Sequence, residues 1–203
     1  MRRERDFAAE TSDVRASVQT LLEIGDVVFG RAWNVRGDPR HEPFVSAVSR
    51  VLGVALPHAP MTRTRATGAT LLWLGPRSSL LIGDEAVSEN DVESARVAMN
   101  AAAGALFDVS ASYVGWRVSG ATAARALNRA CPLDLHPTVF AAGQCAQSLL
   151  GHVNALFYKP GDGPSFVVLV ARSFAADAFH TLREAAHADG YRIVERSRFS
   201  QAG

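Results

Sequence analysis

The chain has 203 residues, of which 48% are hydrophobic and 20% are charged, a composition typical of a globular protein and not of a disordered one. The formal net charge is only +1, from 21 basic and 20 acidic residues, so we expect no strong field that would attract nucleic acid or an anionic membrane. The longest apolar runs are too short to span a bilayer, and no apolar segment of a secretory signal follows the charged first residues.

The number of cysteines indicates the redox environment of the protein. Cys131 and Cys145 are too few for a disulfide framework and suit a reducing environment. One bridge between them stays open as an alternative. We therefore expect a cytoplasmic protein with no nucleic-acid or membrane partner.

The first half of the chain predicts an N-terminal arm followed by an α+β unit. Residues 1–25 are polar and of mixed charge, and we expect them to order only against a partner. A strand near Val28–Val35 is predicted to end at the breaker residues Arg36-Gly37-Asp38-Pro39. Apolar residues at three- and four-residue spacing predict a helix over Phe44–Leu52. Two strands, a helix and a closing strand are then predicted at Ala69–Leu74, Ser79–Ile82, Asn90–Ala103 and Ala105–Val109.

The second half predicts a similar series, interrupted by a stiff connector. The connector contains Cys131, Pro132, Leu133, Asp134, Leu135, His136 and Pro137. Each proline fixes its own φ and restricts the residue before it. Helices are predicted at Thr122–Ala130 and Ala175–His187, and strands at Tyr113–Val118, Ala146–Leu150, Val153–Tyr158, Phe166–Ala171 and Tyr191–Val194.

Two short patterns occur twice, in the same order and at nearly the same spacing. Trp33–Gly37 is matched by Trp116–Gly120, and Leu72–Pro76 is matched by Leu156–Pro160. Together they predict an internal duplication. Each copy reads approximately β-α-β-β-α-β, the ferredoxin-like pattern. We predict an α+β protein with units at residues 26–110 and 111–203, packed as one compact domain.

Motifs for cofactor or metal chemistry are missing from the sequence. We find no dinucleotide-binding glycine pattern, no phosphate-binding loop, no nucleophile elbow and no zinc-ligand spacing. We therefore predict no catalytic, cofactor-binding or metal-binding residue in this chain.

Three polar groups have both a functional and a structural interpretation. Asp108 and Ser110, after a predicted strand, could bind a polar ligand or move a proton, but satisfying backbone donors at a corner is favoured. Asp134 and His136 could form an acid–base pair, but facing solvent or a neighbouring subunit is favoured, with Leu133 and Leu135 in the core. Arg36 and Asp38, flanking Gly37, could contact a partner or an ion, but a local turn pair is favoured.

Several stretches of the chain resemble the sarcosine oxidase gamma subunit family. They include the turn with Arg36, Gly37 and Asp38, and the strand end with Trp73, Gly75 and Pro76. The remaining matching stretches are Leu52–Pro57, Asp108–Ser110, Cys131–Leu150 and Arg172–Asp177. Their order and spacing carry the resemblance, and we expect these residues to form the interface or structural motif of the chain.

The resemblance implies a fold related to the folate-binding part of aminomethyltransferases, and membership of a cytoplasmic four-subunit flavoenzyme. Such a complex converts sarcosine to glycine and hydrogen peroxide, with formaldehyde or 5,10-methylenetetrahydrofolate as the one-carbon product. FAD, FMN, NAD and tetrahydrofolate are expected in the alpha and beta subunits. The gamma chain is expected to be a non-catalytic assembly subunit with alpha, beta and delta partners.

Two departures leave the substrate open. Where the family usually has an acidic residue and a tryptophan, this chain has Arg77, Ser78 and Ser79. After Ser110 it has Ala111, Ser112 and Tyr113 in place of polar or basic residues. One alternative is a sister complex acting on another N-methylated amino acid or amine. Another is a stand-alone, tetrahydrofolate-binding module of the aminomethyltransferase type that uses Asp108.

Overall fold

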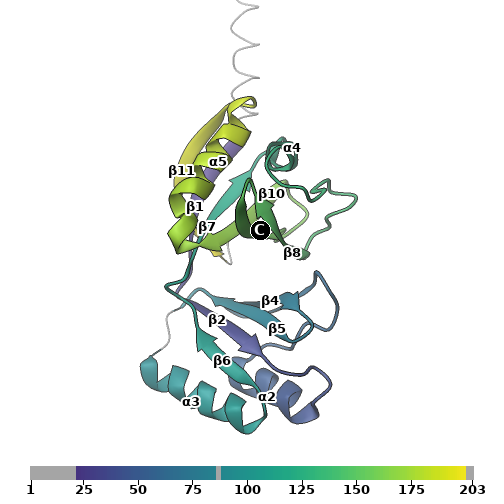
Figure 1. Cartoon of the computed structure of the whole chain (residues 1–203), viewed down its shortest axis with the longest axis vertical. Coiled ribbons are helices and arrows are strands. Elements are labelled where there is room, and N and C mark those ends of the chain that lie inside the picture. The colour runs from purple at the N-terminus through teal and green to yellow at the C-terminus, as the bar shows by residue number, and fades with distance from the viewer. Residues whose placement is uncertain (1–21, 86–87, 200–203) are drawn as a thin grey trace, which may run out of the picture.

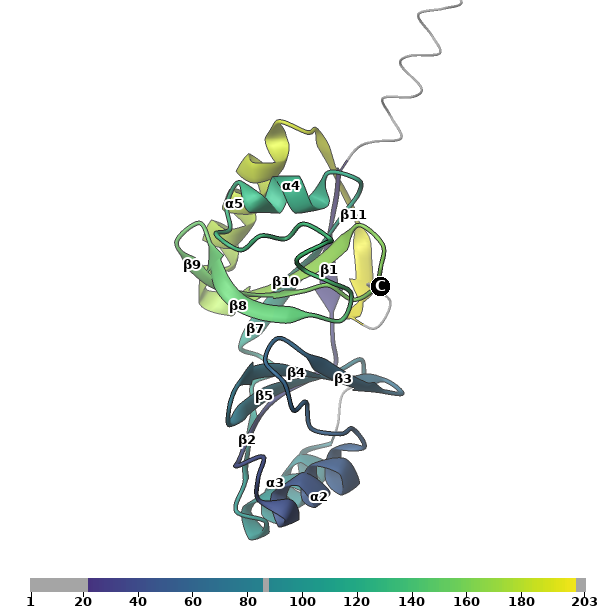
Figure 2. The same ribbon diagram turned by 90° about the vertical axis from the view of Figure 1, so that its right-hand side faces the viewer.

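The computed structural model of the protein describes residues 22–85 and 88–199, and it has four layers. Two β-sheets face each other in the middle, and two pairs of helices cover their outer faces (Figures 1 and 2). This is the α+β architecture predicted from the sequence. No helix in these residues is long and apolar enough to cross a membrane.

The first unit forms the five-stranded sheet. Its elements, in chain order, are β2 (Arg31–Arg36), α2 (Glu42–Leu52), β3 (Arg63–Ala66), β4 (Ala69–Gly75), β5 (Ser78–Gly83), α3 (Glu89–Ala101) and β6 (Ala105–Asp108). The strand order is β3-β4-β5-β2-β6. Local sequence fixes the helix ends: Gly53 ends α2 at φ 68°, a conformation that suits glycine, and the Ser88 side chain accepts a hydrogen bond from the Asp91 N–H at the start of α3.

The second unit repeats the order of elements. It contains β7 (Tyr113–Ser119), α4 (Ala123–Asn128), β8 (Cys145–Leu150), β9 (Val153–Tyr158), β10 (Ser165–Ala171), a 3₁₀ turn (Arg172–Phe174), α5 (Ala175–His187) and β11 (Tyr191–Arg198). Its six-stranded sheet has the order β11-β1-β7-β10-β9-β8, which matches the first sheet once β1 is set aside. Each unit has one strand more than the β-α-β-β-α-β pattern. The extra strand of the second unit, β8, was predicted from the sequence, whereas its counterpart in the first unit, β3, was not. The internal duplication itself stays a prediction.

The strand that breaks the symmetry is β1 (Leu22–Val28), which belongs to the second sheet although it comes first in the chain. It lies between β7, to which it is antiparallel, and β11, to which it is parallel. The prediction of one strand over Val28–Val35 was therefore wrong, since the chain passes from one sheet to the other at Phe29 and Gly30. Of the predicted arm, residues 1–21 lie outside the described residues, and residues 22–25 are in β1.

Three apolar cores hold the layers together. One lies between the first sheet and α2 and α3, a second between the second sheet and α4 and α5, and a third between the two sheets. The third core contains fully buried residues from both sheets, including Leu72, Leu80, Val167 and Leu169. The Gln147 side-chain amide on β8 also donates to the Leu74 carbonyl at 2.7 Å, which ties an edge of one sheet to the other.

Both cysteines are free and buried, so the alternative of a bridge between them was wrong. Cys145 lies in the core between the sheets, where its thiol donates to the Thr62 carbonyl at 3.3 Å. Burial raises the pKa of this thiol to about 11, which keeps it protonated and unreactive at neutral pH.

Candidate functional site

A pocket of about 220 Å³ at one end of the first sheet brings together two of the predicted motifs. The turn after β2 and the turn between β4 and β5 form one side, and the loop after α2 forms the other. Four prolines stiffen the walls. The lining residues are Val35, Gly37, Pro39, Phe44, Leu56, Pro57, His58, Pro60, Trp73, Gly75, Pro76, Arg77, Ser78 and Ser79.

Gly37 is required here because the ring of Phe44 occupies the space a side chain would need. A Cβ on Gly37 would lie 2.4 Å from Cε2 of Phe44, and one on Gly104 would lie 2.5 Å from Cδ2 of the same ring. Phe44 is 1% exposed, so it cannot move aside into solvent. The N–H of Gly37 donates to the Arg77 carbonyl at 3.2 Å, which joins the two turns. The glycine in this motif therefore serves close packing.

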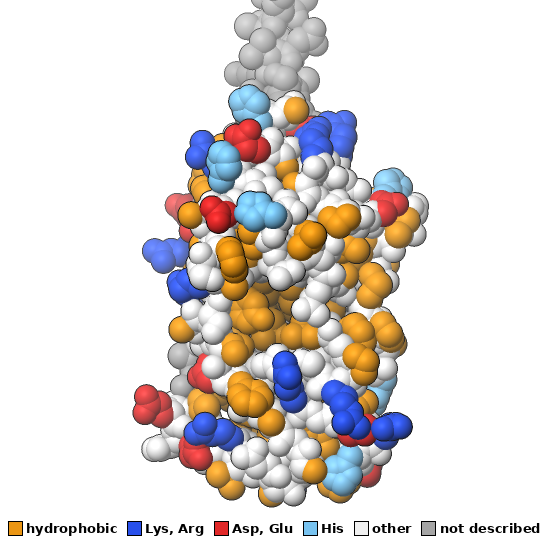
Figure 3. Space-filling view, in the orientation of Figure 1, with side chains coloured by type: hydrophobic (Ala, Val, Ile, Leu, Met, Phe, Trp, Pro, Cys, Tyr) orange, Lys and Arg blue, Asp and Glu red, His pale blue; other side chains and the backbone are white. Residues whose placement is uncertain are grey.

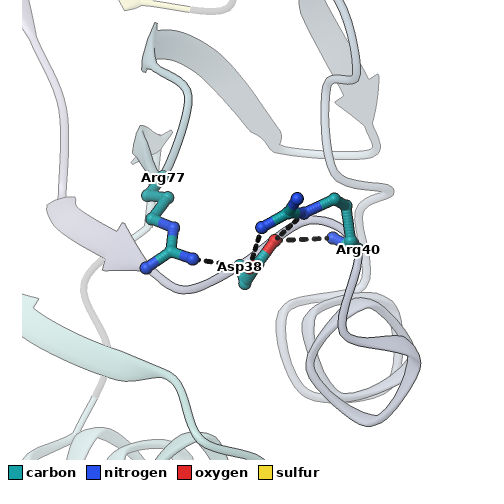
Figure 4. Close-up of polar contacts among 3 residues, drawn as sticks. All are labelled: Asp38, Arg40 and Arg77. Carbon is teal, nitrogen blue, oxygen red and sulfur yellow. Dashed lines mark hydrogen bonds and ion pairs between the residues drawn. The ribbon is translucent and has the colours of Figure 1, made fainter.

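Asp38 is held between two arginines (Figure 4). Its carboxylate accepts from Arg77 Nη2 at 2.6 Å and from Arg40 Nη2 at 2.9 Å. The hydrogen bonds from Arg40 and the two positive charges hold the pKa of Asp38 well below its usual range. Arg36 bonds to Asn34 instead, at 2.9 Å, so the favoured Arg36–Asp38 turn pair was wrong.

The cluster of Asp38, Arg40 and Arg77 has a half-buried carboxylate and two exposed arginines, and it carries one more positive than negative charge. The side chains of Arg40 and Arg77 are 83% and 66% exposed. Exposed ion pairs add little to stability. Their guanidinium groups are instead well placed to contact an acidic surface, since arginine is enriched at protein interfaces.

Trp73, Gly75 and Pro76 line the pocket beside an irregularity in β4. Trp73 pairs with Ser79 and Gly75 with Ser78, so Leu74 is the extra residue of a β-bulge. The bulge turns the strand into the Gly75-Pro76 corner. Trp73 is half-buried at the pocket, and its carbonyl accepts from the Cys145 thiol at 3.5 Å.

The Cys131–Pro137 connector lies in the second unit and does not meet the pocket. Leu135 is fully buried and Leu133 half-buried in the core against α4 and α5, whereas Asp134 and His136 are exposed. The Asp134 carboxylate accepts from the His136 backbone N–H at 2.9 Å, and His136 Nδ1 lies 2.7 Å from Thr138 Oγ1. These contacts are local, and the two side chains do not bond to each other as an acid–base pair would. The structural interpretation, with Asp134 and His136 facing outward, is the one that the contacts match.

Asp108 and Ser110 join the end of β6 to β2. The Asp108 carboxylate accepts from the N–H of Ser110 at 2.8 Å and from its hydroxyl at 2.6 Å. Ser110 Oγ in turn accepts from the Ala32 N–H at 2.9 Å. Both side chains therefore satisfy backbone donors, the favoured interpretation. No three His, Cys, Asp or Glu side chains in residues 22–85 and 88–199 are arranged to hold a metal ion.

The loop after α2 completes the pocket, a role that was not predicted from the sequence. Leu56, Pro57, His58 and Pro60 come from this loop, which crosses the end of the sheet. The run of prolines was a usable signal, because a stiff, irregular segment next to a buried leucine indicates a fixed wall.

A second hollow lies where the two sheets meet. Hydrophobic side chains gather there on one face of the molecule, over β4, β9 and β10 (Figure 3). The hollow has a volume of about 470 Å³, and its lining residues are Leu74, Tyr113, Gln147, Ser148, Leu149, Asn154, Ala155, Leu156, Leu169 and Ala171. We call it the junction groove. A contiguous apolar hollow of this kind is typical of a protein-binding surface.

Comparison with known proteins gives one consistent result. Residues 36–189 match the sequence model of the sarcosine oxidase gamma subunit family. The chain is 28% identical to sarcosine oxidase subunit gamma of Corynebacterium sp. (strain U-96), over 88% of this chain and 83% of that one. It is 29% identical to the same subunit of Arthrobacter sp., over 84% and 83% of the two chains.

Solved structures share the fold. A chain of the heterotetrameric sarcosine oxidase from Corynebacterium sp. U-96 superposes with a TM-score of 0.76 at 24% identity, over 94% of this chain and 98% of that one. Aminomethyltransferase T of the glycine cleavage system from Bartonella henselae superposes with a TM-score of 0.58 at 14% identity, over 91% of this chain and 50% of that one. The expected relation to the aminomethyltransferase fold is confirmed.

Proposed function

The chain belongs to the sarcosine oxidase gamma subunit family, and we propose that it is the non-catalytic assembly subunit of a heterotetrameric sarcosine oxidase. The observation that carries this proposal is the family match, which extends across both units of the fold from residue 36 to residue 189. A match over both sheets indicates that the whole molecule, and not one grafted motif, is adapted to the family's role.

In this proposal the chemistry takes place in other chains. The complex would oxidise the N-methyl group of sarcosine and release glycine and hydrogen peroxide, with formaldehyde or 5,10-methylenetetrahydrofolate as the one-carbon product. FAD, FMN, NAD and tetrahydrofolate would be held by the alpha and beta subunits, and a small delta subunit would complete the assembly.

Two surfaces of this chain support a partner-binding role. The junction groove is apolar and open, and covering it would remove hydrophobic surface from water. The pocket beside Asp38 combines rigid proline walls with exposed arginines. An apolar patch flanked by arginine is the composition of a protein interface core and its rim.

The experiment that tests the proposal is purification of the tagged full chain from its native cells, with mass spectrometry and a flavin absorption spectrum. We expect yellow material that contains two larger chains and a small fourth chain, and that oxidises sarcosine. Oxidation of another N-methylated compound in place of sarcosine would identify a sister complex. A colourless, solitary protein would contradict the assembly role, and calorimetry with tetrahydrofolate would then test the aminomethyltransferase-like alternative.

A matched pair of variants tests the junction groove separately. Leu149 lines the groove and is 40% exposed, and Val139 is 56% exposed and does not line it. Because both side chains are accessible, a charge at either position should leave the fold intact. We expect Leu149→Glu to reduce recovery of the larger chains at least tenfold and Val139→Glu to leave recovery unchanged. Equal recovery with both variants would show that partners bind elsewhere.

A further inference from the structure

A third hollow, in the first unit, contains buried donors that have no acceptor. It lies between α2 and α3, with β2 and β5 as its floor, and has a volume of about 430 Å³. We call it the helix groove. Its lining residues are Arg31, Trp33, Val51, Leu52, Leu81, Asp91, Ser94, Ala95 and Ala98.

Trp33 supplies the first buried donor of the helix groove. The residue is 4% exposed, and its indole Nε1 has no hydrogen-bond partner in the described part of the chain. A buried N–H without a partner is unfavourable, and most such groups in folded proteins are satisfied by protein, water or ligand. The indole N–H can only donate, so the missing partner must be an acceptor.

Arg31 supplies a second donor beside it. Arg31 Nε is also buried without a partner among the described residues, and the guanidinium carbon lies 5.4 Å from the centroid of the Trp33 ring. The side chain packs over Gly83 on the neighbouring strand, where a Cβ would lie 2.4 Å from Nε. A guanidinium next to an indole N–H forms a set of donors suited to a carboxylate.

An acidic group lines the same groove at the start of α3. The Asp91 side chain is exposed, and one of its oxygens accepts from the Ser88 hydroxyl at 2.7 Å. Apolar side chains of Leu52, Leu81 and Ala95 also line the groove. The groove therefore offers donors for an anion, an acceptor for a cation and an apolar surface.

The second unit also has a hollow beside a tryptophan, with a volume of about 360 Å³, but its lining differs. There the corresponding tryptophan, Trp116, is stacked against Phe179 of α5, with ring centroids 5.7 Å apart. The corresponding helix α3 contains no aromatic residue, and it presents Ser94, Ala95 and Ala98 to the groove. The groove over Trp33 differs from that hollow in its two buried donors, since none of the residues that line the hollow beside Trp116 has a buried, unpartnered donor among the described residues.

We propose that the helix groove binds a small zwitterionic carboxylate of the amino-acid type. Its carboxylate would accept from Trp33 Nε1–H and Arg31, and its ammonium group would face Asp91. Because both donor nitrogens are buried, we expect the long, half-buried Arg31 side chain to move when the ligand enters. The site is formed by the first unit alone, so this inference does not depend on assembly into an oxidase.

The test is nuclear magnetic resonance of the full chain, with ¹⁵N in the indole groups of its three tryptophans, titrated with glycine. If the chain is stable only with its partners, this chain alone is labelled and the complex is reassembled. Phenylalanine substitutions at Trp33, Trp73 and Trp116 assign the three signals. We expect glycine to shift the Trp33 signal downfield in a saturable way and to leave the Trp73 and Trp116 signals in place.

Variants and ligand analogues decide the chemistry. Arg31→Met should weaken glycine binding at least tenfold, and Asp91→Asn should make glycine bind no better than acetate. An unmoved Trp33 signal, or the same response in Arg31→Met, would overturn the site. Acetate binding to the unaltered chain as tightly as glycine would overturn the assignment to a zwitterion. Trp116→Phe is the matched control, since it removes an indole outside the groove.

Discussion

The two units have the same order of helices and strands, yet each completes its core differently. The second sheet accepts β1 between β7 and β11, and Phe179 stacks on Trp116. The first sheet pairs β2 directly with β6, and small residues of α3 leave Trp33 beside an open groove. The difference shows that one topology can surround its tryptophan in two ways: with a stacked ring in one half of the molecule, and with two buried donors that lack a partner among the described residues in the other.

The largest effect is expected from β1, the strand that only the second unit uses. Ile24 is 1% exposed in the core against α4 and α5, so Ile24→Ala should cost about 2–5 kcal/mol through the cavity it leaves. Urea unfolding measures the loss, and hydrogen exchange should show β7 and β11 losing protection before β4 and β5. Val28→Ala on the same strand is the control, because Val28 is 39% exposed. Equal loss of protection in both sheets would mean that the units unfold as one.

A clash in the first unit should have the next largest effect. Gly37→Ala would place a methyl group 2.4 Å from the Phe44 ring, and overpacking of this kind costs about 1–3 kcal/mol. Gly75→Ala is the matched control in the same pocket, since nothing lies within 4 Å of its Cβ position. We expect a lower urea midpoint for the first variant only. Similar midpoints for the two variants would show that Phe44 can shift.

An ion cluster in the second unit should give a pH-dependent effect of moderate size. Asp189, whose side chain is 2% exposed, bonds to Arg125 and Arg129 of the α4 region. The hydrogen bond from Arg129 and the two charges lower the pKa of Asp189. A lowered pKa contributes stability above the unfolded pKa of roughly 3.9, and this contribution is lost as the pH falls through the folded value.

Asp189→Asn should therefore cost about 1–2 kcal/mol at pH 7, and the difference from the unaltered chain should shrink as the pH falls below about 5. Urea unfolding at several pH values measures it. Glu93→Gln is the control, since the Glu93–Arg96 pair is exposed on both sides and should matter little. A difference that stays constant down to pH 3 would contradict a role for the Asp189 charge.

The smallest effect concerns the aromatic pair of the second unit. A double-mutant cycle with Phe179→Leu and Trp116→Leu should give a coupling of about 0.5–1.5 kcal/mol, as expected for stacked rings. The same cycle in the first unit, with Arg31→Met and Trp33→Leu, tests the cation–π contact at 5.4 Å. Coupling in the first unit that exceeds that in the second would show that Arg31 holds its tryptophan more strongly than the stacked ring holds Trp116.

Most elements were predictable because their signals are local. The amphipathic spacing after Glu42 places α2 within two residues of its observed start, and the apolar run of β10 marks a strand covered on both faces. The short strand β3 was missed because Arg63, Thr64 and Arg65 carry no apolar alternation. Likewise, Phe29 and Gly30 give no local sign that the chain changes sheets there.

The candidate site was predictable only in part. The sequence determined the two glycine-containing turns with Gly37 and Gly75, the stiff connector, and the charges that flank them, because turn chemistry depends on neighbouring residues. Only the tertiary structure decided that these turns meet each other and the loop after α2, and that Asp38 pairs with Arg77 and not with Arg36. It also placed β1 in the second sheet. Such contacts join residues far apart along the chain, and their energies come from packing and charge in three dimensions, which no local pattern records.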